Sequence, residues 1–324
     1  MDNQASVSPV RTAGPAELVF RTPHPRLAGL VLAYTGQDWT VARPLLRRIT
    51  ALATVVLVID FQPPVRTLVT NSRVPGQDMG ASPVTGMRDR PMTIEQAGRM
   101  HGLTVQLTAP GAHALFGVPL RELTGSYAGF HDLLGTGSRH LTDRLAEAPD
   151  WPARFRLLDS YLIARIDAGP ELPAQVRHAW QRLSMLSGDV RIGALADEVG
   201  WSRQHLNARF RREIGLSPKS VARIARLQRS LSLMYDTGPL SWADAAAAAG
   251  YADQPHLNRD FRMLTGCSPT EFRTLLADWR GVLTGNYRLT HRPRQRPAGP
   301  WAQPMRTRTI RPDASVTNRS CRAS

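Results

Sequence analysis

The sequence has few cysteines, few acidic residues and no long apolar segment. Its 324 residues include only two cysteines, Cys267 and Cys321, which excludes a disulfide scaffold and favours a reducing, cytoplasmic environment. No run of about 18 apolar residues occurs, so we expect no membrane-spanning helix. The N-terminus also lacks the basic-then-apolar order of a secretion signal.

Basic residues outnumber acidic ones, 41 to 26, which gives a formal net charge of +15. The excess is uneven: it is +2 over residues 1–174, +5 over residues 175–280 and +8 over residues 281–324. A nearly neutral front half and a cationic rear half favour a polyanionic partner, with nucleic acid ahead of an anionic membrane surface. A solvated basic surface has the same composition, so charge alone does not decide between them.

Residues 16–170 are predicted to form a strand-rich domain with trailing helices. Up to residue 110, segments rich in Val, Leu and Thr are separated by Pro- and Gly-containing turns; they are ELVFRT, GLVLAYTG, TVVLVIDF, VRTLVTN and LTVQLTAP. Strands without intervening long helices favour a cupin-like β-barrel or sandwich over a parallel sheet. From Pro119 to Ile166 apolar residues recur at three- and four-residue steps, which predicts helices that cover the sheet or pair with a second copy of the chain.

Polar segments divide the rest of the chain. Residues 1–15 are predicted to be a flexible N-terminus and residues 171–178 a linker. Residues 179–280 have helical periodicity, whereas the Arg- and Pro-rich residues 286–324 are predicted to be a disordered tail. We therefore expect an α+β fold in which a strand-rich N-terminal domain precedes an all-α C-terminal domain.

The C-terminal domain contains one short sequence twice. HLNARFRREIGLSP (205–218) and HLNRDFRMLTGCSP (256–269) share eight of 14 positions at a constant offset of 51 residues. In each copy a glycine ends one helical pattern, a capping residue starts the next, and a Gly-x-Ser-Pro segment ends that one. Two tandem helix-turn-helix units are predicted. Their structural positions are Gly200, Ser202, Leu206, Phe210, Gly215 and Pro218, then Gly250, Asp253, Leu257, Phe261, Gly266 and Pro269.

A continuous helix is predicted between the two copies, because Val221, Ile224, Leu227, Leu231 and Met234 lie on one helical face. Such a helix would hold the units at a fixed separation. Neighbouring major-groove segments on one side of B-DNA are about 34–36 Å apart, so each unit can place a helix in one of them. One helix-turn-helix pattern is common among helix pairs. Two copies with shared landmarks on a cationic segment favour DNA binding, and two units are too few for a helical repeat array.

These residues resemble the AraC/XylS family of bacterial transcription regulators. The resemblance is carried by LADEVGWSRQHLNARFRREIGLSPKSV, by the linker helix RLQRSLSLM and by AAAAAGYADQPHLNRDFRMLTGCSPTEF. It implies a seven-helix domain whose two units read adjacent major-groove segments. Base contacts are expected from the early, outward positions of each recognition helix.

Carried over position by position, the resemblance places base contacts at Gln204, Asn207, Ala208, Gln254, Pro255, Asn258 and Arg259. Ala208 and Pro255 depart from the pattern, since neither side chain makes a polar base contact. We therefore predict base contacts by Arg203, Gln204, Asn207, Gln254, Asn258 and Arg259. Phosphate contacts are predicted for Arg211, Arg226, Arg229 and Arg262. Ser230, where the family favours Ala, is expected to matter little.

The resemblance implies a sequence-specific DNA-binding transcriptional regulator and not an enzyme. The partners it implies are double-stranded DNA, with a small-molecule effector, a second copy of the chain and RNA polymerase as further candidates, and no cofactor. The front half resembles the family's cupin-like sensor domains only in its order of strands and helices, and its most distinctive stretch, LTAPGAHALFGVPLRELTG, indicates no particular ligand.

The sequence leaves two alternative functions open, a DNA-repair alkyltransferase and an architectural DNA binder, and its histidines raise the question of a metal site. DNA-repair alkyltransferases carry a similar DNA-binding module and need a reactive cysteine, but Cys267 matches Leu216 of the first copy, where packing is expected. An architectural DNA binder without an effector would not need the strand-rich front half. That half contains five histidines without a His-x-His pair, so we expect no metal site; they are His24, His101, His113, His131 and His140.

Overall fold

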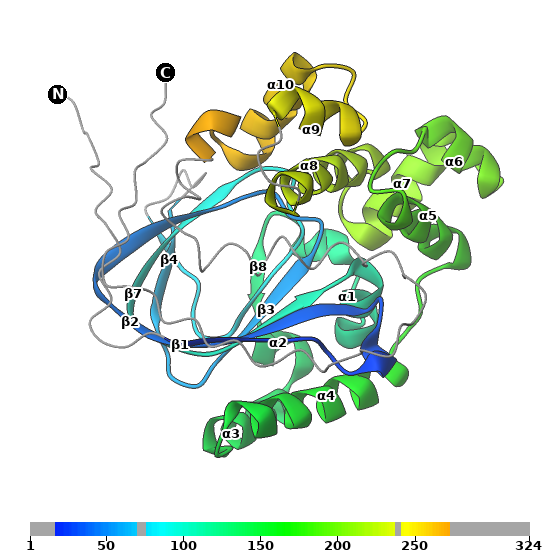
Figure 1. Cartoon of the computed structure of the whole chain (residues 1–324). Helices are drawn as coiled ribbons and strands as arrows, with labels where there is room; N and C mark the ends of the chain where they lie inside the picture. The colour runs from blue at the N-terminus through cyan, green and yellow to red at the C-terminus, as the bar shows by residue number, and fades with distance from the viewer. Residues whose placement is uncertain (1–16, 70–75, 237–240, 273–324) are drawn as a thin grey trace, which may run out of the picture.

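The computed structural model describes residues 17–69, 76–236 and 241–272 (Figure 1). A sheet-rich N-terminal part is followed by helices, which confirms the predicted α+β class. The predicted flexible N-terminus (1–15) and disordered tail (286–324) lie outside the described residues, as do residues 273–280 of the predicted helical domain.

Every strand pairing in the N-terminal domain is antiparallel. The order is β1-β2-β7-β3-β6-β8, and β4 pairs with both β7 and β5. The strands are β1 (Glu17–Arg21), β2 (Val31–Ile49), β3 (Val55–Asp60), β4 (Val65–Leu68), β5 (Gln77–Asp78), β6 (Pro83–Thr85), β7 (Met92–Leu107) and β8 (Tyr127–Gly129).

This sheet is not a closed barrel, which corrects the finer part of the prediction. Its end strands β1 and β8 are not paired with each other in the part of the chain that the structure describes. The two longest strands, β2 and β7, pair from Val31–Leu107 to Ile49–Met92, with an irregular register between Val41 and Leu45. The sequence predicted only the apolar half of each, because the other halves carry charged side chains and Pro44.

In the part of the N-terminal domain that the structure describes, four α-helices accompany the sheet: α1 (Ala109–Phe116), α2 (Phe130–Leu134), α3 (Thr136–Glu147) and α4 (Trp151–Asp167). Periodicity predicted the last three, whereas α1 was missed because its eight residues include a proline and a glycine. The ring of Phe155 on α4 stacks on Tyr34 of the sheet at 5.8 Å between centroids. The Tyr34 hydroxyl donates to Asp159 at 2.9 Å, and burial raises the pKa of Tyr34. Helix α4 is thereby fixed to the sheet.

The C-terminal domain contains α5 (Ala174–Met185), α6 (Ile192–Glu198), α7 (Arg203–Ile214), α8 (Pro218–Asp236), α9 (Trp242–Ala248) and α10 (Gln254–Thr265). Helix α5 takes in most of the segment predicted as a linker (171–178), because Val176 joins the hydrophobic core. The predicted connecting helix is continuous from Pro218 past Met234. None of these described helices is long and apolar enough to cross a membrane.

A buried ion pair lies within the sheet domain. The Arg66 guanidinium donates two hydrogen bonds to Asp60, at 2.8 and 2.9 Å, and the two side chains are 3% and 0% exposed. The Ser82 amide donates a third bond to the same carboxylate at 2.7 Å. Charges removed from water are tolerated only when they are paired in this way, so each partner depends on the other.

Replacing Asp60 with Ala should lower the free energy of unfolding by about 3–5 kcal/mol, because Arg66 would remain buried and unpaired. The matched control is Asp38→Ala, which removes the partner of the half-exposed Arg99 and should cost no more than about 1 kcal/mol. Urea denaturation of both variants measures the difference. Equal losses in the two variants would contradict this role for the buried pair.

Candidate nucleic-acid interface

The first helix-turn-helix unit consists of α6 and α7. Gly200 lies between them with φ +70°, a left-handed conformation that favours glycine. The Ser202 hydroxyl accepts a hydrogen bond from the His205 amide at 3.1 Å and so caps α7. Leu206 and Phe210 are fully buried, which fixes the face that α7 turns toward the core.

The second unit consists of α9 and α10 and repeats this construction. Gly250 has φ +79°, and the Asp253 carboxylate accepts from the His256 amide at 2.6 Å. Leu257 and Phe261 are fully buried at the positions that match Leu206 and Phe210. The two sequence copies therefore have the same local structure.

Both units end in the same way. Gly215 follows α7 with φ +94° and Gly266 follows α10 with φ +77°. Pro218 is the first residue of α8, and Pro269 is the first residue of a further helical segment. The repeated Gly-x-Ser-Pro segment thus separates one helix from the next in each copy.

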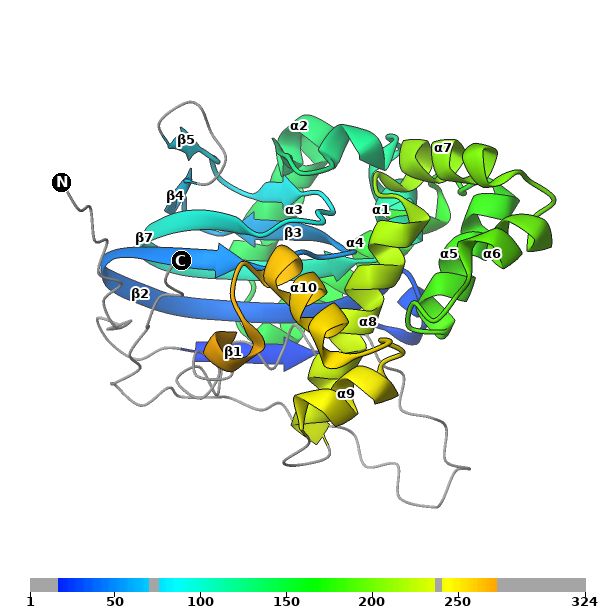
Figure 2. The ribbon, with the colours of Figure 1, turned by 90° about the horizontal axis from the view of Figure 1, so that it is seen from above.

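Helix α8 connects the two units. Its 19 residues correspond to a length of about 28 Å at the usual α-helical rise. Helix α7 lies near one end of α8, α9 lies near the other, and α10 packs alongside it (Figures 1 and 2). Both candidate recognition helices therefore rest on a single stiff element.

Most of the predicted base-contacting side chains are exposed. Arg203, Gln204 and Asn207 lie in the first turns of α7. Gln254 and Arg259 lie in the first turns of α10, at the positions that match Arg203 and Ala208. All five residues are exposed, and the guanidinium of Arg203 lies against Gly193 of α6. The remaining residue of this set, Asn258, is not fully exposed.

Asn258 is only half-exposed, unlike its counterpart Asn207. Its Oδ1 is buried and has no hydrogen-bond partner among the described residues. A contact that uses both Oδ1 and Nδ2 of this side chain therefore requires rotation of the amide. Ala208 and Pro255, the two departures from the AraC/XylS pattern, are both exposed.

The predicted phosphate-contacting arginines fall into two groups. Arg211 and Arg262 are exposed at matching positions of α7 and α10, whereas Arg226 and Arg229 are half-buried on α8. The guanidinium carbon of Arg226 lies 5.2 Å from the ring centroid of Tyr251, a cation–π contact that the sequence did not predict. The contact joins α8 to the turn before α10.

The exposed face of α7 is cationic. Arg203, Arg211 and Arg212 are exposed, and the one acidic residue of the helix, Glu213, is buried. Oε1 of Glu213 lies 3.8 Å from a guanidinium nitrogen of Arg209 and 3.7 Å from one of Arg212, so the negative charge is paired within α7. The outward surface suits a polyanion.

An ion pair between α8 and α10 was also missed by sequence reasoning. Arg223 donates two hydrogen bonds to Oδ1 of Asp260, at 3.0 and 2.7 Å, and the side chains are 22% and 6% exposed. Burial, together with the Asp260 carboxylate, raises the pKa of the nearby Tyr251 hydroxyl. An acidic residue beside the buried Leu257 and Phe261 was the available signal, since such a charge needs a partner.

Comparison with known proteins agrees with this geometry. The family described as Helix-turn-helix domain matches residues 195–274, which span both units. The arabinose operon regulatory protein of Escherichia coli K12 is 30% identical over 126 residues, or 37% of this chain and 43% of that protein. The chain thus covers less than half the length of this curated relative. The matched residues include those that resemble the AraC/XylS regulators.

Two solved structures are also similar. An AraC family transcriptional regulator from Rhodopseudomonas palustris shares 28% identity, covers 31% of this chain and 94% of that one, and has a TM-score of 0.28. Apo ToxT from Vibrio cholerae shares 13% identity over 75% of this chain and 97% of that one, with a TM-score of 0.43.

Ser230 stands where AraC/XylS domains favour Ala. Its side chain is fully buried, and the hydroxyl donates to the Leu227 carbonyl at 2.8 Å within α8. The hydroxyl is therefore satisfied inside its own helix.

Cys267, the cysteine considered in the sequence, occupies a structural position. Cys267 is 5% exposed and packs in the hydrophobic core, as does Leu216 at the matching position. Its thiol is therefore not presented to DNA as an alkyltransferase would require, and Cys321 lies outside the described residues. Over residues 17–69, 76–236 and 241–272, no three His, Cys, Asp or Glu side chains gather as metal ligands would.

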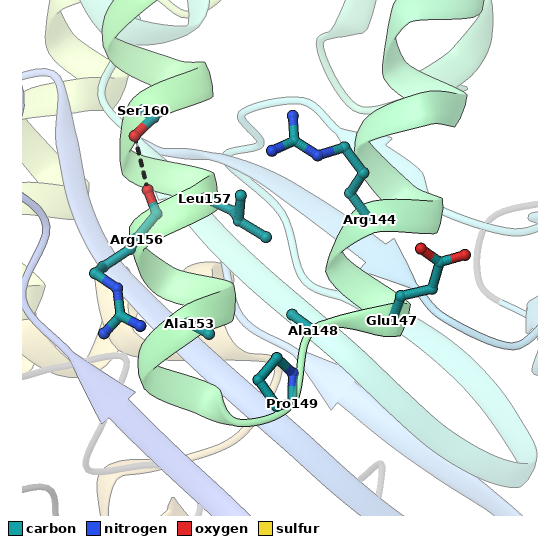
Figure 3. A pocket seen from close by; sticks show the side chains of 8 residues that line it. All are labelled: Arg144, Glu147, Ala148, Pro149, Ala153, Arg156, Leu157 and Ser160. Atoms are coloured by element: carbon teal, nitrogen blue, oxygen red, sulfur yellow. Dashed lines mark hydrogen bonds between the residues drawn. The ribbon is translucent and has the colours of Figure 1, made fainter.

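A surface pocket lies on the sheet domain, between the end of α3 and the first half of α4 (Figure 3). Three of its eight lining residues are charged, and the Ser160 hydroxyl donates within α4 to the Arg156 carbonyl at 3.0 Å. It is lined by Arg144, Glu147, Ala148, Pro149, Ala153, Arg156, Leu157 and Ser160. All of its lining residues belong to α3, α4 and the connection between them, and none belongs to the helical C-terminal domain.

Replacing Asp260 with Ala should lower the free energy of unfolding by about 1–3 kcal/mol, because Arg223 would lose its partner while staying mostly buried. The control is Arg262→Ala, two residues away on the exposed face of α10, which should change stability by less than about 0.5 kcal/mol. Urea denaturation measures both. A loss of the same small size in Asp260→Ala would mean that this ion pair does not stabilise the second unit.

Proposed function

We propose that this protein is a sequence-specific DNA-binding transcriptional regulator. The proposal rests on one observation. Helices α7 and α10 each expose a polar face, and both pack against the single helix α8. The match of the helical domain to a helix-turn-helix family and its similarity to the arabinose operon regulatory protein support the same function. Each unit would place one helix in the major groove, on neighbouring segments of one side of the duplex.

The base-reading chemistry follows from the exposed side chains. Arginine donates two hydrogen bonds to guanine, and asparagine or glutamine exchanges two with adenine. The proposed contacts are Arg203, Gln204 and Asn207 in the first unit and Gln254, Asn258 and Arg259 in the second. Exposed Arg211 and Arg262 would pair with phosphates, and the half-buried Arg226 and Arg229 would contribute the outer ends of their guanidinium groups.

The sheet domain is proposed to sense a small molecule or to join two copies of the chain, with residues 16–170 as a cupin-like sensor domain and residues 179–280 as the DNA-binding domain. Its antiparallel sheet has a helical layer that includes α3 and α4, which agrees with that role. RNA polymerase is the further partner expected of a regulator.

Replacing Asn207 with Ala should weaken binding to a duplex selected by the protein from random sequence by roughly 5- to 150-fold, the equivalent of about 1–3 kcal/mol for one bidentate base contact. Binding to unselected duplex should change less than about twofold, because phosphate contacts would persist. Fluorescence anisotropy at one fixed salt concentration measures both affinities.

The matched control is Gln181→Ala, which removes an exposed amide from α5 outside the two units. It should bind both duplexes as the unchanged protein does. Equal weakening of selected and unselected duplex by Asn207→Ala would defeat the base-reading assignment.

A further inference from the structure

The sheet domain contacts the end of the second recognition helix. The Ala51 amide, in the connection after β2, donates to the Leu264 carbonyl at 2.7 Å. The Arg48 guanidinium donates to the Gly266 carbonyl at 2.9 Å. Both acceptors belong to the C-terminal end of α10, where helix carbonyls lack partners within the helix.

The sheet domain also contacts the end of the first recognition helix and the start of α8. A Cβ atom on Gly215 would lie 2.0 Å from Oγ1 of Thr124, so only glycine permits this approach to the 3-10 helix at Leu120–Leu123. Five residues later, the Ser220 hydroxyl donates to the Asp89 carboxylate at 3.0 Å. The first unit is therefore held by its C-terminal end, as the second is.

The segments that make these contacts are bonded to one another. Leu52, next to Ala51, exchanges two backbone hydrogen bonds of 3.0 Å with Arg88, which precedes Asp89. The Gly125 amide, next to Thr124, donates to the Met87 carbonyl at 3.0 Å. A continuous hydrogen-bonded support thus runs from the contact with α10 to the contact with α7.

The contacts with the sheet domain leave the polar faces of α7 and α10 exposed. Arg203, Gln204 and Asn207 on α7 are exposed in the docked arrangement, and so are Gln254 and Arg259 on α10. These residues lie toward the N-terminal ends of their helices, whereas the sheet domain holds the C-terminal ends. The arrangement therefore orients the helices without covering their outward surfaces.

We infer that this support positions both recognition helices for simultaneous contact with DNA, with Arg48, Ala51 and Asp89 as its positioning residues. The inference rests on the proposed function. A second unit that is already oriented loses less conformational freedom on binding, so it adds more to the affinity for a two-part site. A change of shape in the sheet domain at these segments would reach both units together.

The test compares Arg48→Ala/Asp89→Ala with the control Arg43→Ala/Asp143→Ala, which removes the same residue types from exposed places on β2 and α3. The probes are a duplex selected by the protein from random sequence and the same duplex with one half of the protected site scrambled. We expect the first variant to bind the intact site roughly tenfold more weakly and the half-scrambled site within about twofold of the unchanged protein. The control should match the unchanged protein on both.

Hydrogen exchange at the Ala51 amide provides a readout that needs no DNA. It should be protected in the unchanged protein and in the control, and should exchange faster in Arg48→Ala/Asp89→Ala. An unprotected amide in the unchanged protein would overturn the docking itself. Faster exchange with unchanged or tighter binding to the intact site would overturn the positioning role. A protein with a protected amide that selects no duplex would overturn the proposed function, and with it the inference.

Discussion

The packing of α8 is the constraint on which the helical domain depends. Val221, Ile224, Leu227 and Leu231 form a buried row along this helix, and α5, α7, α9 and α10 all contact it. These residues recur about once per helical turn, so the single helix α8 packs against both helix-turn-helix units. The two recognition helices are consequently related through α8, and neither unit needs direct contact with the other to be oriented.

The second unit is fixed to α8 by polar contacts as well as apolar ones. Arg223 pairs with Asp260, and Arg226 lies over Tyr251, so two side chains one turn apart on α8 hold α10 and the turn before it. The sheet domain adds a separate set of contacts at the opposite end of α10. Helix α10 is therefore restrained along its length, while its outward face remains open. The residues that fix the orientation of α10 are therefore different from those on its exposed face.

Local features were predictable from the sequence because their causes are local. Ser202 and Asp253 cap helices through amides three residues away, and Gly200 and Gly250 take up turns that disfavour other residues. The duplication made these signals readable twice. Contacts such as Ala51 with Leu264 join residues more than 200 positions apart, and the sequence of neither segment indicates which residue it contacts. The open sheet was missed for the same reason, since strand closure depends on pairing and not on the pattern within a strand.

The central claim is that two units on one helix enter neighbouring major grooves together. Methylation protection of guanine N7 on a selected duplex tests it most directly, because that atom faces the major groove. The account predicts two protected patches whose centres lie about 10 base pairs apart on one side of the DNA. A single patch, or two patches about half a turn apart on opposite sides, would contradict it.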